Sequence, residues 1–178
     1  DDDTVAIATA MGARVLTRAF DGYRSQKEFA VSQASHDWVL SLDADERVSD
    51  RLRAAIEVAR DGRFVGASGY RFARLSQYFG KFLRHGNAYP DRNLRLFDRR
   101  KAGFRGTREV HETVSAAGPV LDLHGDLIHY PYRSLEQQLS KTQRYARMMA
   151  EYDHARGKQA SVLKLILSPA WRFWRGYV

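Results

Sequence analysis

The segment that says most about the architecture is 38–46, Trp38-Val-Leu-Ser-Leu-Asp-Ala-Asp-Glu46. The first five residues form a short, mostly apolar run with β-branched and aromatic character, and acidic side chains follow at once. Such a run predicts a short buried strand, and we expect it to lie parallel to its neighbours. Asp43 would then stand at the carboxyl end of a strand, where α/β sheets collect ligands.

Helical patterns are found on both sides of this strand. A short helix is expected to end at Gly12, and residues 25–35 have the composition of a second helix, with a brief strand at 14–16 between them. Downstream, Ser49 is the predicted N-cap of a helix that ends near Gly62. Its apolar residues fall on one face: Leu52, Ala55, Ile56 and Ala59. Alternating helices and strands predict an α/β fold, with a mostly parallel central sheet flanked by helices.

The second half of the chain changes character twice. Short β-prone pieces at 70–79, 93–97, 109–114 and 120–129 are separated by Gly, Pro and Asn, which favours longer loops and antiparallel pairing. From Ser134 the spacing of apolar residues is helical again, and Gln137 completes a predicted capping box. We therefore expect C-terminal helices after the sheet.

Composition limits the kinds of chemistry available. The protein has 178 residues, which suits one domain, and it has no cysteine, which excludes disulfides, thiol nucleophiles and thiolate metal sites. The net charge of +8 attracts anions without distinguishing nucleic acid, anionic lipid or phosphorylated substrates. No run approaches the roughly 20 apolar residues of a spanning helix.

The last segment, 162–178, mixes apolar and aromatic residues with Lys164, Arg172 and Arg175. Aromatic rings beside cations are typical of a helix that lies on a membrane surface. The other interpretation is a terminal helix, interrupted at Pro169, that docks on the core.

Asp43 and Asp45 are the strongest candidates for chemistry. Two carboxylates one residue apart at the end of a strand can hold a hard divalent cation and leave coordination positions open for diphosphate oxygens. The alternative interpretation is that they are solvated acidic residues that cap the following helix.

Several motifs, in order, resemble the family-two inverting glycosyltransferases, and in particular their lipopolysaccharide-core glucosyltransferase branch. The run 38–46 looks like the metal-binding motif of that family. The other matching stretches are Asp2-Asp3-Thr4, 22–30, Tyr89-Pro90-Asp91, Arg95-Leu96-Phe97, Val110-His111-Glu112, His129-Tyr130 and 141–145. Together they cover nearly the whole chain.

This resemblance implies a GT-A type nucleotide-diphospho-sugar transferase fold, with a catalytic domain at 1–157 and a basic aromatic amphipathic segment at 158–178. It also implies that the family's first strand and helix would precede Asp1. The implied cofactor is Mg²⁺ or Mn²⁺, and the implied donor is a nucleotide sugar, with UDP-glucose expected. The acceptor would be a lipid-linked glycan such as the lipopolysaccharide core, reached by peripheral membrane contact at the cytoplasmic face of the bacterial inner membrane. Nucleic acid is not an expected partner.

The same resemblance suggests roles for individual residues. An inverting transferase needs a general base, and Glu112 is the candidate, with Glu109 as a substitute that would face the other side of a regular strand. His129 is expected as a third metal ligand beside Asp43 and Asp45, or as a donor to the diphosphate. The cations expected to bind substrate are Lys27, Arg95, Lys141 and Arg144. Each of these side chains also has a purely structural interpretation, as a strand residue, a structural histidine or a solvated charge.

Three alternatives remain open at this stage. A polyprenyl-phosphate sugar transferase would use the same site chemistry. A metal-dependent phosphatase would use the first acid of an Asp-x-Asp pair as its nucleophile, although Glu46-Arg47 fits that motif poorly. A basic binding module for nucleic acid or anionic lipid would explain the charge but not the acidic triplet.

Overall fold

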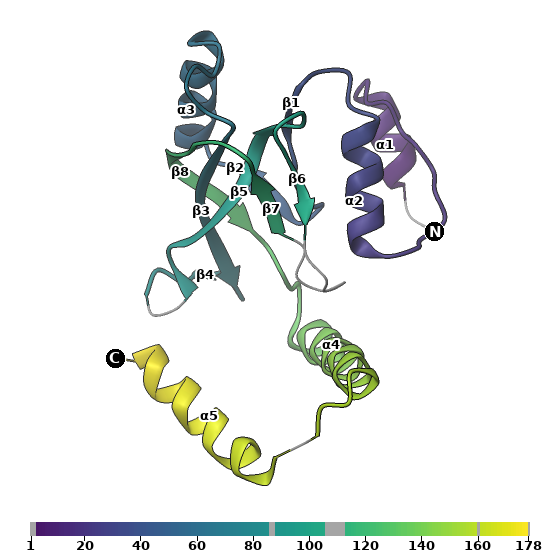
Figure 1. The fold of residues 1–178 in the computed structure, drawn as a ribbon, viewed down its shortest axis with the longest axis vertical. Helices are drawn as coiled ribbons and strands as arrows, with labels where there is room; N and C mark the ends of the chain where they lie inside the picture. Colours follow the sequence, from purple (N-terminus) through teal and green to yellow (C-terminus); the bar gives the residue numbers. More distant parts are fainter. Residues whose placement is uncertain (1–2, 86–87, 106–112, 160, 178) are drawn as a thin grey trace.

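The computed structural model describes residues 3–85, 88–105, 113–159 and 161–177. A curled mixed sheet occupies the centre, α1 and α2 lie beside it, and α4 and α5 extend from one end (Figure 1). The helices are α1 (Thr4–Ala10), α2 (Tyr23–Ser32), α3 (Asp50–Asp61), α4 (Leu135–Ala155) and α5 (Val162–Tyr177). The strands are β1 (Trp38–Leu40), β2 (Glu46–Val48), β3 (Gly69–Tyr78), β4 (Lys81–Phe82), β5 (Asp91–Asp98), β6 (Ala102–Arg105), β7 (Thr113–Ala116) and β8 (Val120–His129).

The strand order of the central sheet is β1-β5-β3-β8-β2, with β4 paired to β3. The predicted α/β class is confirmed, but the expectation of a mostly parallel sheet is wrong for the described strands, where β3 with β8 is the one parallel pair. β1 is therefore not the parallel strand that its apolar run predicted. It runs in the same direction as β3, but β5 lies between them and pairs antiparallel with both.

A short connection joins the two edges of this sheet. β1 and β2 lie at opposite ends of the strand order, yet only residues 41–45 separate them in the chain. A flat sheet of this order would place the two edges about 19 Å apart, given about 4.8 Å between neighbouring strands. Because residues 43–46 form a tight turn, closed by the Glu46 N–H donating to the Asp43 carbonyl at 3.0 Å, the sheet must curl to bring its edges together.

Helix α3 covers one face of the sheet and packs on β8. Leu52 of α3 is fully buried in a core cluster with Tyr70, Phe72, Leu96 and Leu127. The predicted N-cap is confirmed, because the Ser49 hydroxyl accepts from the Leu52 N–H at 3.2 Å and also from the Asp126 N–H at 3.1 Å. The helix begins where the sequence predicted and is tied to β8 by the same serine.

The other face of the sheet carries the hairpin of β6 and β7. Phe104 of β6 packs edge-on against Phe97 of β5, with ring centroids 6.2 Å apart. Helix α2 contacts β6, and α1 lies outside α2 (Figure 1). This hairpin and α2 form a wall over the carboxyl end of β1.

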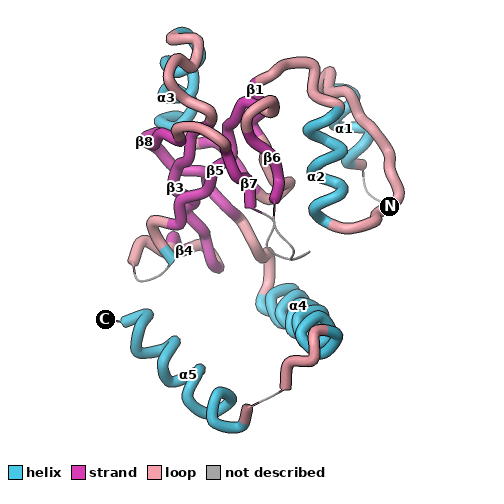
Figure 2. The backbone as a smooth tube through the Cα atoms, in the orientation of Figure 1, coloured by secondary structure: helices cyan, strands magenta, loops and turns pink. Residues whose placement is uncertain are grey.

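The remaining predictions have mixed outcomes. Strands at 70–79, 93–97 and 120–129 and helices at 25–35 and from Ser134 are confirmed within a few residues. The strand expected at 14–16 is wrong, since residues 13–22 form a long loop (Figure 2) in which Val15 and Leu16 are exposed and pair with no strand. Of the predicted strand at 109–114, residues 109–112 lie outside the described residues, and 113–114 belong to β7.

Helices α4 and α5 stand apart from the core. The Ser134 hydroxyl caps α4 by accepting from the Gln137 N–H at 3.1 Å, while the Gln137 side chain accepts from the Arg133 N–H at 2.7 Å, one residue before the expected position. In α5 every side chain that the structure describes is exposed, so the interpretation of α5 as a core-docking helix is wrong. No helix in the described ranges is long and apolar enough to cross a bilayer.

Candidate active site

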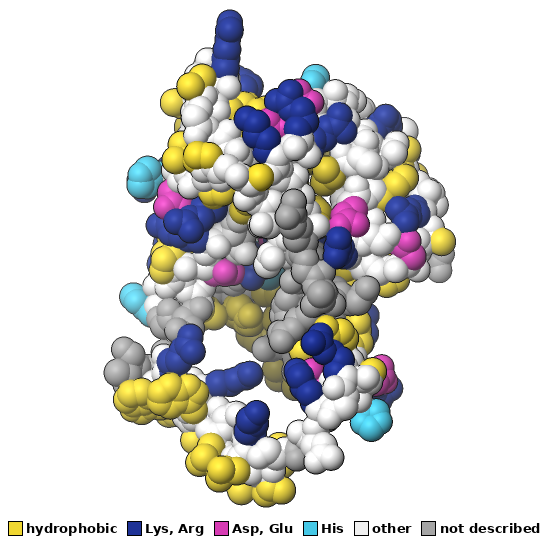
Figure 3. Space-filling model, in the orientation of Figure 1, with side chains coloured by type: hydrophobic (Ala, Val, Ile, Leu, Met, Phe, Trp, Pro, Cys, Tyr) yellow, Lys and Arg dark blue, Asp and Glu magenta, His cyan; other side chains and the backbone are white. Residues whose placement is uncertain are grey.

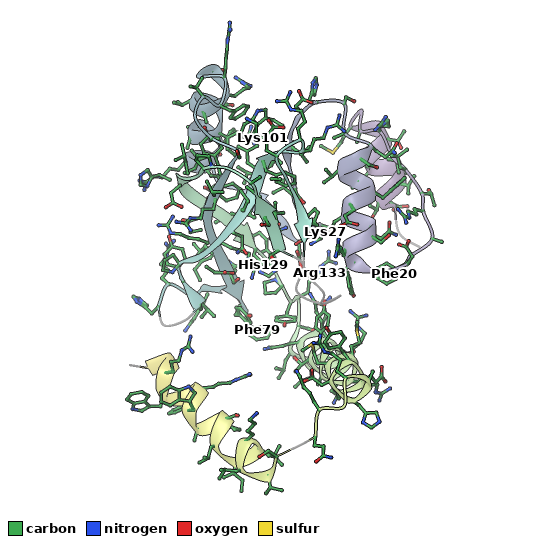
Figure 4. All side chains as sticks on the ribbon, in the orientation of Figure 1. Phe20, Lys27, Phe79, Lys101, His129 and Arg133 are labelled. Carbon is green, nitrogen blue, oxygen red and sulfur yellow. The ribbon has the colours of Figure 1, made fainter. Side chains whose placement is uncertain are left out.

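A cavity of about 1460 Å³ lies where the acidic turn, α2, the sheet and α4 meet. This volume exceeds the usual range for a single small-molecule pocket, so there is room for more than one substrate. Lys27 and His129 face this region from α2 and from the end of β8 (Figure 4). A smaller cavity of about 440 Å³, near Trp38 and Asp98, contains none of the predicted site residues.

Hydrogen bonds fix the backbone of the acidic turn at both ends. On one side the Ser41 N–H donates to the Arg95 carbonyl at 2.8 Å, and on the other the Tyr130 N–H donates to the Asp45 carbonyl at 2.8 Å. Within the turn, the Asp43 N–H donates to Oε2 of Glu46 at 2.9 Å. The turn is therefore attached to β5, to the end of β8 and to itself.

The Asp43 carboxylate is held by two cations. Oδ1 lies 3.0 Å from Nζ of Lys27, and Oδ2 lies 2.9 Å from Nη2 of Arg95. The same Nη2 lies 2.8 Å from Oε1 of Glu46, whose side chain is fully buried. Lys27 and Arg95, both predicted to bind substrate, are thus brought to the cavity, but their acidic partner in the protein is Asp43.

The electrostatics of these carboxyl groups follow from burial and from the cations. Burial raises the pKa of Asp43, but the charges of Arg95 and Lys27 outweigh it and hold this pKa below its usual value. For Glu46 burial dominates and raises the pKa, although Arg95 opposes the shift. Asp43 is consequently ionised at neutral pH, so its carboxylate can attract or bind a cation.

Asp45 has longer contacts than Asp43. Its Oδ2 lies 3.5 Å from Nε2 of His129 and 3.9 Å from Nζ of Lys141, which also lies over the Tyr132 ring. The hydrogen bond with His129 lowers the pKa of Asp45; burial opposes this, and the charges of His129 and Lys141 add to it. Asp45 and His129 therefore form an acid–imidazole pair that opens into the cavity.

The chemistry of this pair fits a divalent cation. Nδ1 of His129 lies 3.0 Å from the Ser76 hydroxyl, which leaves Nε2 directed toward Asp45. Metal-binding histidines are commonly oriented in this way by a partner on the second ring nitrogen. No group of three or more acidic or histidine side chains gathers at one point among the described residues, so part of the coordination shell would come from substrate or water.

The two predicted cations of α4 differ in whether they line the cavity. Lys141 lines the cavity from α4, whereas Arg144 does not line it and instead lies over the Tyr145 ring. Tyr145 itself lines the cavity and contacts Tyr23 of α2; burial and this contact raise the pKa of Tyr23. Helices α2 and α4 therefore meet across the cavity.

The predicted base, Glu112, and its substitute Glu109 lie outside the described residues. Their roles stay predictions. The neighbouring strand β7, which follows directly after them, contributes Thr113 to the cavity wall.

Two side chains of the site were missed by sequence reasoning. Glu46 was interpreted as part of the acidic run, but its carboxylate organises the turn. Ser76 orients His129 although the two residues are 53 positions apart, and only the parallel pairing of β3 with β8 brings them together. The alternation along β3 could have placed Ser76 on one face, but nothing local points to its partner.

Comparison with known proteins gives the family. The sequence profile described as glycosyl transferase family 2 matches residues 1–118. The chain belongs to glycosyl transferase family 2. It is therefore an enzyme domain of the glycosyltransferase class, and the family brings with it the GT-A fold that the motifs predicted.

Relatives extend the similarity through the C-terminal helices. The chain is 31% identical to an uncharacterized glycosyltransferase of Rickettsia typhi over 99% of its own length and 63% of the relative. It is 32% identical to the lipopolysaccharide core biosynthesis glycosyltransferase LpsC of Rhizobium meliloti over 92% of its own length and 61% of the relative. The chain thus spans somewhat under two thirds of the length of these two relatives.

Proposed function

We propose that this family 2 glycosyltransferase domain is a metal-dependent inverting enzyme that transfers a sugar from a nucleotide-sugar donor, UDP-glucose, to the lipopolysaccharide core. The observation that carries the proposal is the pair of ionised carboxylates, Asp43 and Asp45, beside Lys27, Lys141 and His129 in a large cavity. Family membership removes the phosphatase and binding-module interpretations.

The donor diphosphate is assigned to the part of the cavity between α2 and α4. Lys27 and Lys141 approach the two carboxylates from opposite helices, at 3.0 Å and 3.9 Å. A diphosphate between them would exchange carboxylate–ammonium contacts for phosphate–ammonium contacts. Fixed cations of this kind stabilise the negative charge that develops on a departing nucleoside diphosphate.

Mg²⁺ or Mn²⁺ would be held by Asp45 and His129, with Asp43 contributing charge from a carboxylate that Lys27 and Arg95 already contact. When bound, the cation would add Lewis-acid stabilisation of the leaving diphosphate. Ser76 would fix the His129 ring, and the attachment of the turn to β5 and Tyr130 would fix both carboxylates.

Glu112 is proposed as the base that removes the proton of the acceptor hydroxyl while that oxygen attacks the anomeric carbon opposite the diphosphate. Its position in the chain, directly before the cavity-lining strand β7, supports the assignment. Glu112→Gln should then retain donor affinity and lose transfer.

The acceptor assignment rests on the similarity to the core biosynthesis enzyme and on α5. Its exposed side chains include Leu165, Trp171 and Trp174, with the two tryptophan rings stacked 5.4 Å apart. The helix also carries Lys164, Arg172 and Arg175 and no acidic residue. We propose that the segment 158–178 lies on the cytoplasmic face of the inner membrane, where a lipid-linked glycan is presented.

Calorimetric titration of UDP and UDP-glucose, with and without Mn²⁺, tests the proposal. We expect binding that requires Mn²⁺ in the wild type and is lost in Asp45→Ala. Asp61→Asn is a matched control, because this exposed acid pairs with Arg60 on α3 and does not line the cavity. Metal-independent binding, or equal binding by Asp45→Ala, would refute the assigned donor site.

A further inference from the structure

The hairpin between β3 and β4 presents an exposed apolar and basic tip. Phe79 and Gly80 form the two-residue turn between Tyr78 and Lys81, which face each other across the strand pair. Phe79 is 54% exposed, and Phe82 and Leu83 are 40% and 38% exposed. The hairpin is short but well formed, because the Leu83 N–H also donates to the Ser76 carbonyl at 3.0 Å.

Phe79 is an unfavourable residue for this turn. Its φ is 47° and that of Gly80 is 84°, so both central residues are in the left-handed region. Such two-residue turns favour Asn, Asp or Gly, and a bulky side chain with positive φ is strained. Since more than half of Phe79 is exposed, packing within the protein offsets little of that strain. A contact outside the protein would explain why a phenyl ring stands there.

The charges around the tip indicate what kind of surface it meets. Residues 78–85 contain Lys81 and Arg84 and no acidic residue, and the Arg84 guanidinium lies 5.8 Å from the centre of the Phe82 ring. Aromatic rings flanked by cations suit the boundary between acyl chains and anionic headgroups. A neutral or positively charged protein surface would offer no anionic groups to pair with Lys81 and Arg84.

The hairpin and α5 lie toward the same end of the molecule. Figure 1 shows β4 on the side of the sheet that faces α5, with α3 at the opposite end, and Figure 4 places Phe79 near that same end. Figure 3 shows hydrophobic and basic side chains gathered over α5. The base of the hairpin borders the cavity, since Tyr78, immediately before the tip, lines it.

We infer that the β3–β4 hairpin is a second membrane-contacting element, in which Phe79, Phe82 and Leu83 enter the interface of an anionic bilayer while Lys81 and Arg84 contact lipid phosphates. This inference deepens the proposed function by giving the enzyme two contacts, one on the catalytic body and one on α5. With two contacts the mouth of the cavity keeps a fixed orientation to the lipid surface, whereas α5 alone would act only as a tether.

Co-sedimentation of the full chain with vesicles tests the inference. The vesicles are phosphatidylcholine alone or mixed with phosphatidylglycerol, and the variants are Phe79→Asn, Lys81→Glu with Arg84→Glu, and Val58→Ser as a control. Val58 is exposed on α3, at the far end of the molecule (Figure 1). We expect Phe79→Asn to weaken binding to anionic vesicles by about tenfold, the size expected for one buried aromatic ring. The charge reversal should do the same in a salt-dependent way, and Val58→Ser should bind like the wild type.

A thermal melt distinguishes loss of lipid contact from loss of folding. Because Asn tolerates positive φ, Phe79→Asn should melt at the wild-type temperature or above it. Wild-type vesicle binding by Phe79→Asn would overturn the inference and leave α5 as the contact. If analytical ultracentrifugation finds a wild-type dimer that Phe79→Asn loses while vesicle binding is kept, the inference is overturned and the hairpin contacts a second copy of the chain. UDP titration of Phe79→Asn should match the wild type. The titration therefore tests the donor site, and vesicle binding tests the membrane contact, so one proposal can fail without the other.

Discussion

One guanidinium nitrogen of Arg95 bridges two carboxylates, lying 2.8 Å from Oε1 of Glu46 and 2.9 Å from Oδ2 of Asp43. Arg95 lines the cavity and was predicted to bind substrate, which stays a prediction; within the protein its contacts hold the acidic turn in place. Removing it would take from the fully buried Glu46 side chain the cation that lies 2.8 Å from its carboxylate.

We predict that Arg95→Met lowers the unfolding free energy by about 3 kcal/mol or more, as for other broken buried ion pairs. Adding Glu46→Gln should recover part of that loss, because the uncompensated charge is removed as well. Urea unfolding of the four forms at pH 7 measures the coupling. Arg60→Met, which breaks the exposed pair with Asp61, should cost no more than about 0.5 kcal/mol. Strict additivity of the two site changes would contradict the bridge.

Lys141 should matter for the donor more than for folding. Its Nζ is 3.9 Å from Asp45, and its side chain lines the cavity. We predict that Lys141→Met weakens Mn²⁺-dependent UDP binding by about tenfold, the typical value of one charge-assisted contact. Calorimetry checks this, with Lys158→Met as the control, since Lys158 pairs with Asp153 away from the cavity. Equal effects of the two substitutions would mean that only net charge is involved.

Asp98 provides a pH-dependent contribution to stability. It is almost completely buried and accepts hydrogen bonds from the Arg100 side chain at 2.9 Å and 2.8 Å, which lower its pKa although burial opposes the shift. Because the folded pKa lies below the ordinary value of 3.8, the contribution is complete above that pH and is lost as the pH falls through the folded pKa. We predict that the stability difference between wild type and Asp98→Asn is large at pH 7 and shrinks below about pH 4.

Denaturant unfolding over a pH series measures this difference. Arg100→Gln should reproduce the same profile, since it removes the cause of the shift. A difference that is constant with pH would show that Asp98 acts through shape and not through charge.

Gly125 marks a close approach of β8 to α3. Its φ is +118°, and a Cβ built there would lie 2.4 Å from the Leu52 nitrogen and 2.6 Å from its Cα. Both are backbone atoms of a capped helix, so neither can move aside cheaply. Gly125→Ala should therefore destabilise the protein by about 3 kcal/mol or more. Gly103→Ala, where nothing lies within 4 Å, should change stability by less than about 0.5 kcal/mol. Thermal or urea unfolding compares the two.

Local patterns predicted elements better than pairings. Strand β8 agrees with its predicted range, and Ser49 caps α3 as expected, because periodicity and capping act within a few residues. The pairing of β1 was mispredicted, since an apolar run does not reveal that β5, some 50 residues later, will pair with it. The same holds at the site, where local motifs were predicted and contacts between distant residues were not.

Asp43 and Asp45 were predicted from their place after a strand, and Lys27 from the family motif; all three line the cavity. The bridge of Arg95 to Glu46 depends on a contact 49 positions apart. Arg144 was placed at the site by its helical turn; Lys141 of that turn lines the cavity, and Arg144 lies over the ring of Tyr145, which lines it. Helical spacing alone shows which residues share a face of α4, but it does not show that the face with Lys141 and Tyr145 is the one that lines the cavity.

The short connection between β1 and β2 makes the positions of the two carboxylates depend on the curvature of the sheet. Its backbone is bonded to the Arg95 carbonyl on β5 and to the Tyr130 N–H after β8, two strands that are separated by β3. Flattening the sheet would pull these two attachment points apart and stretch the segment that carries Asp43 and Asp45. Any substitution in the β3 core that changes the curl, however distant from the cavity, would therefore change the spacing of the acidic pair, so the packing of the sheet and the geometry of these two carboxylates depend on each other.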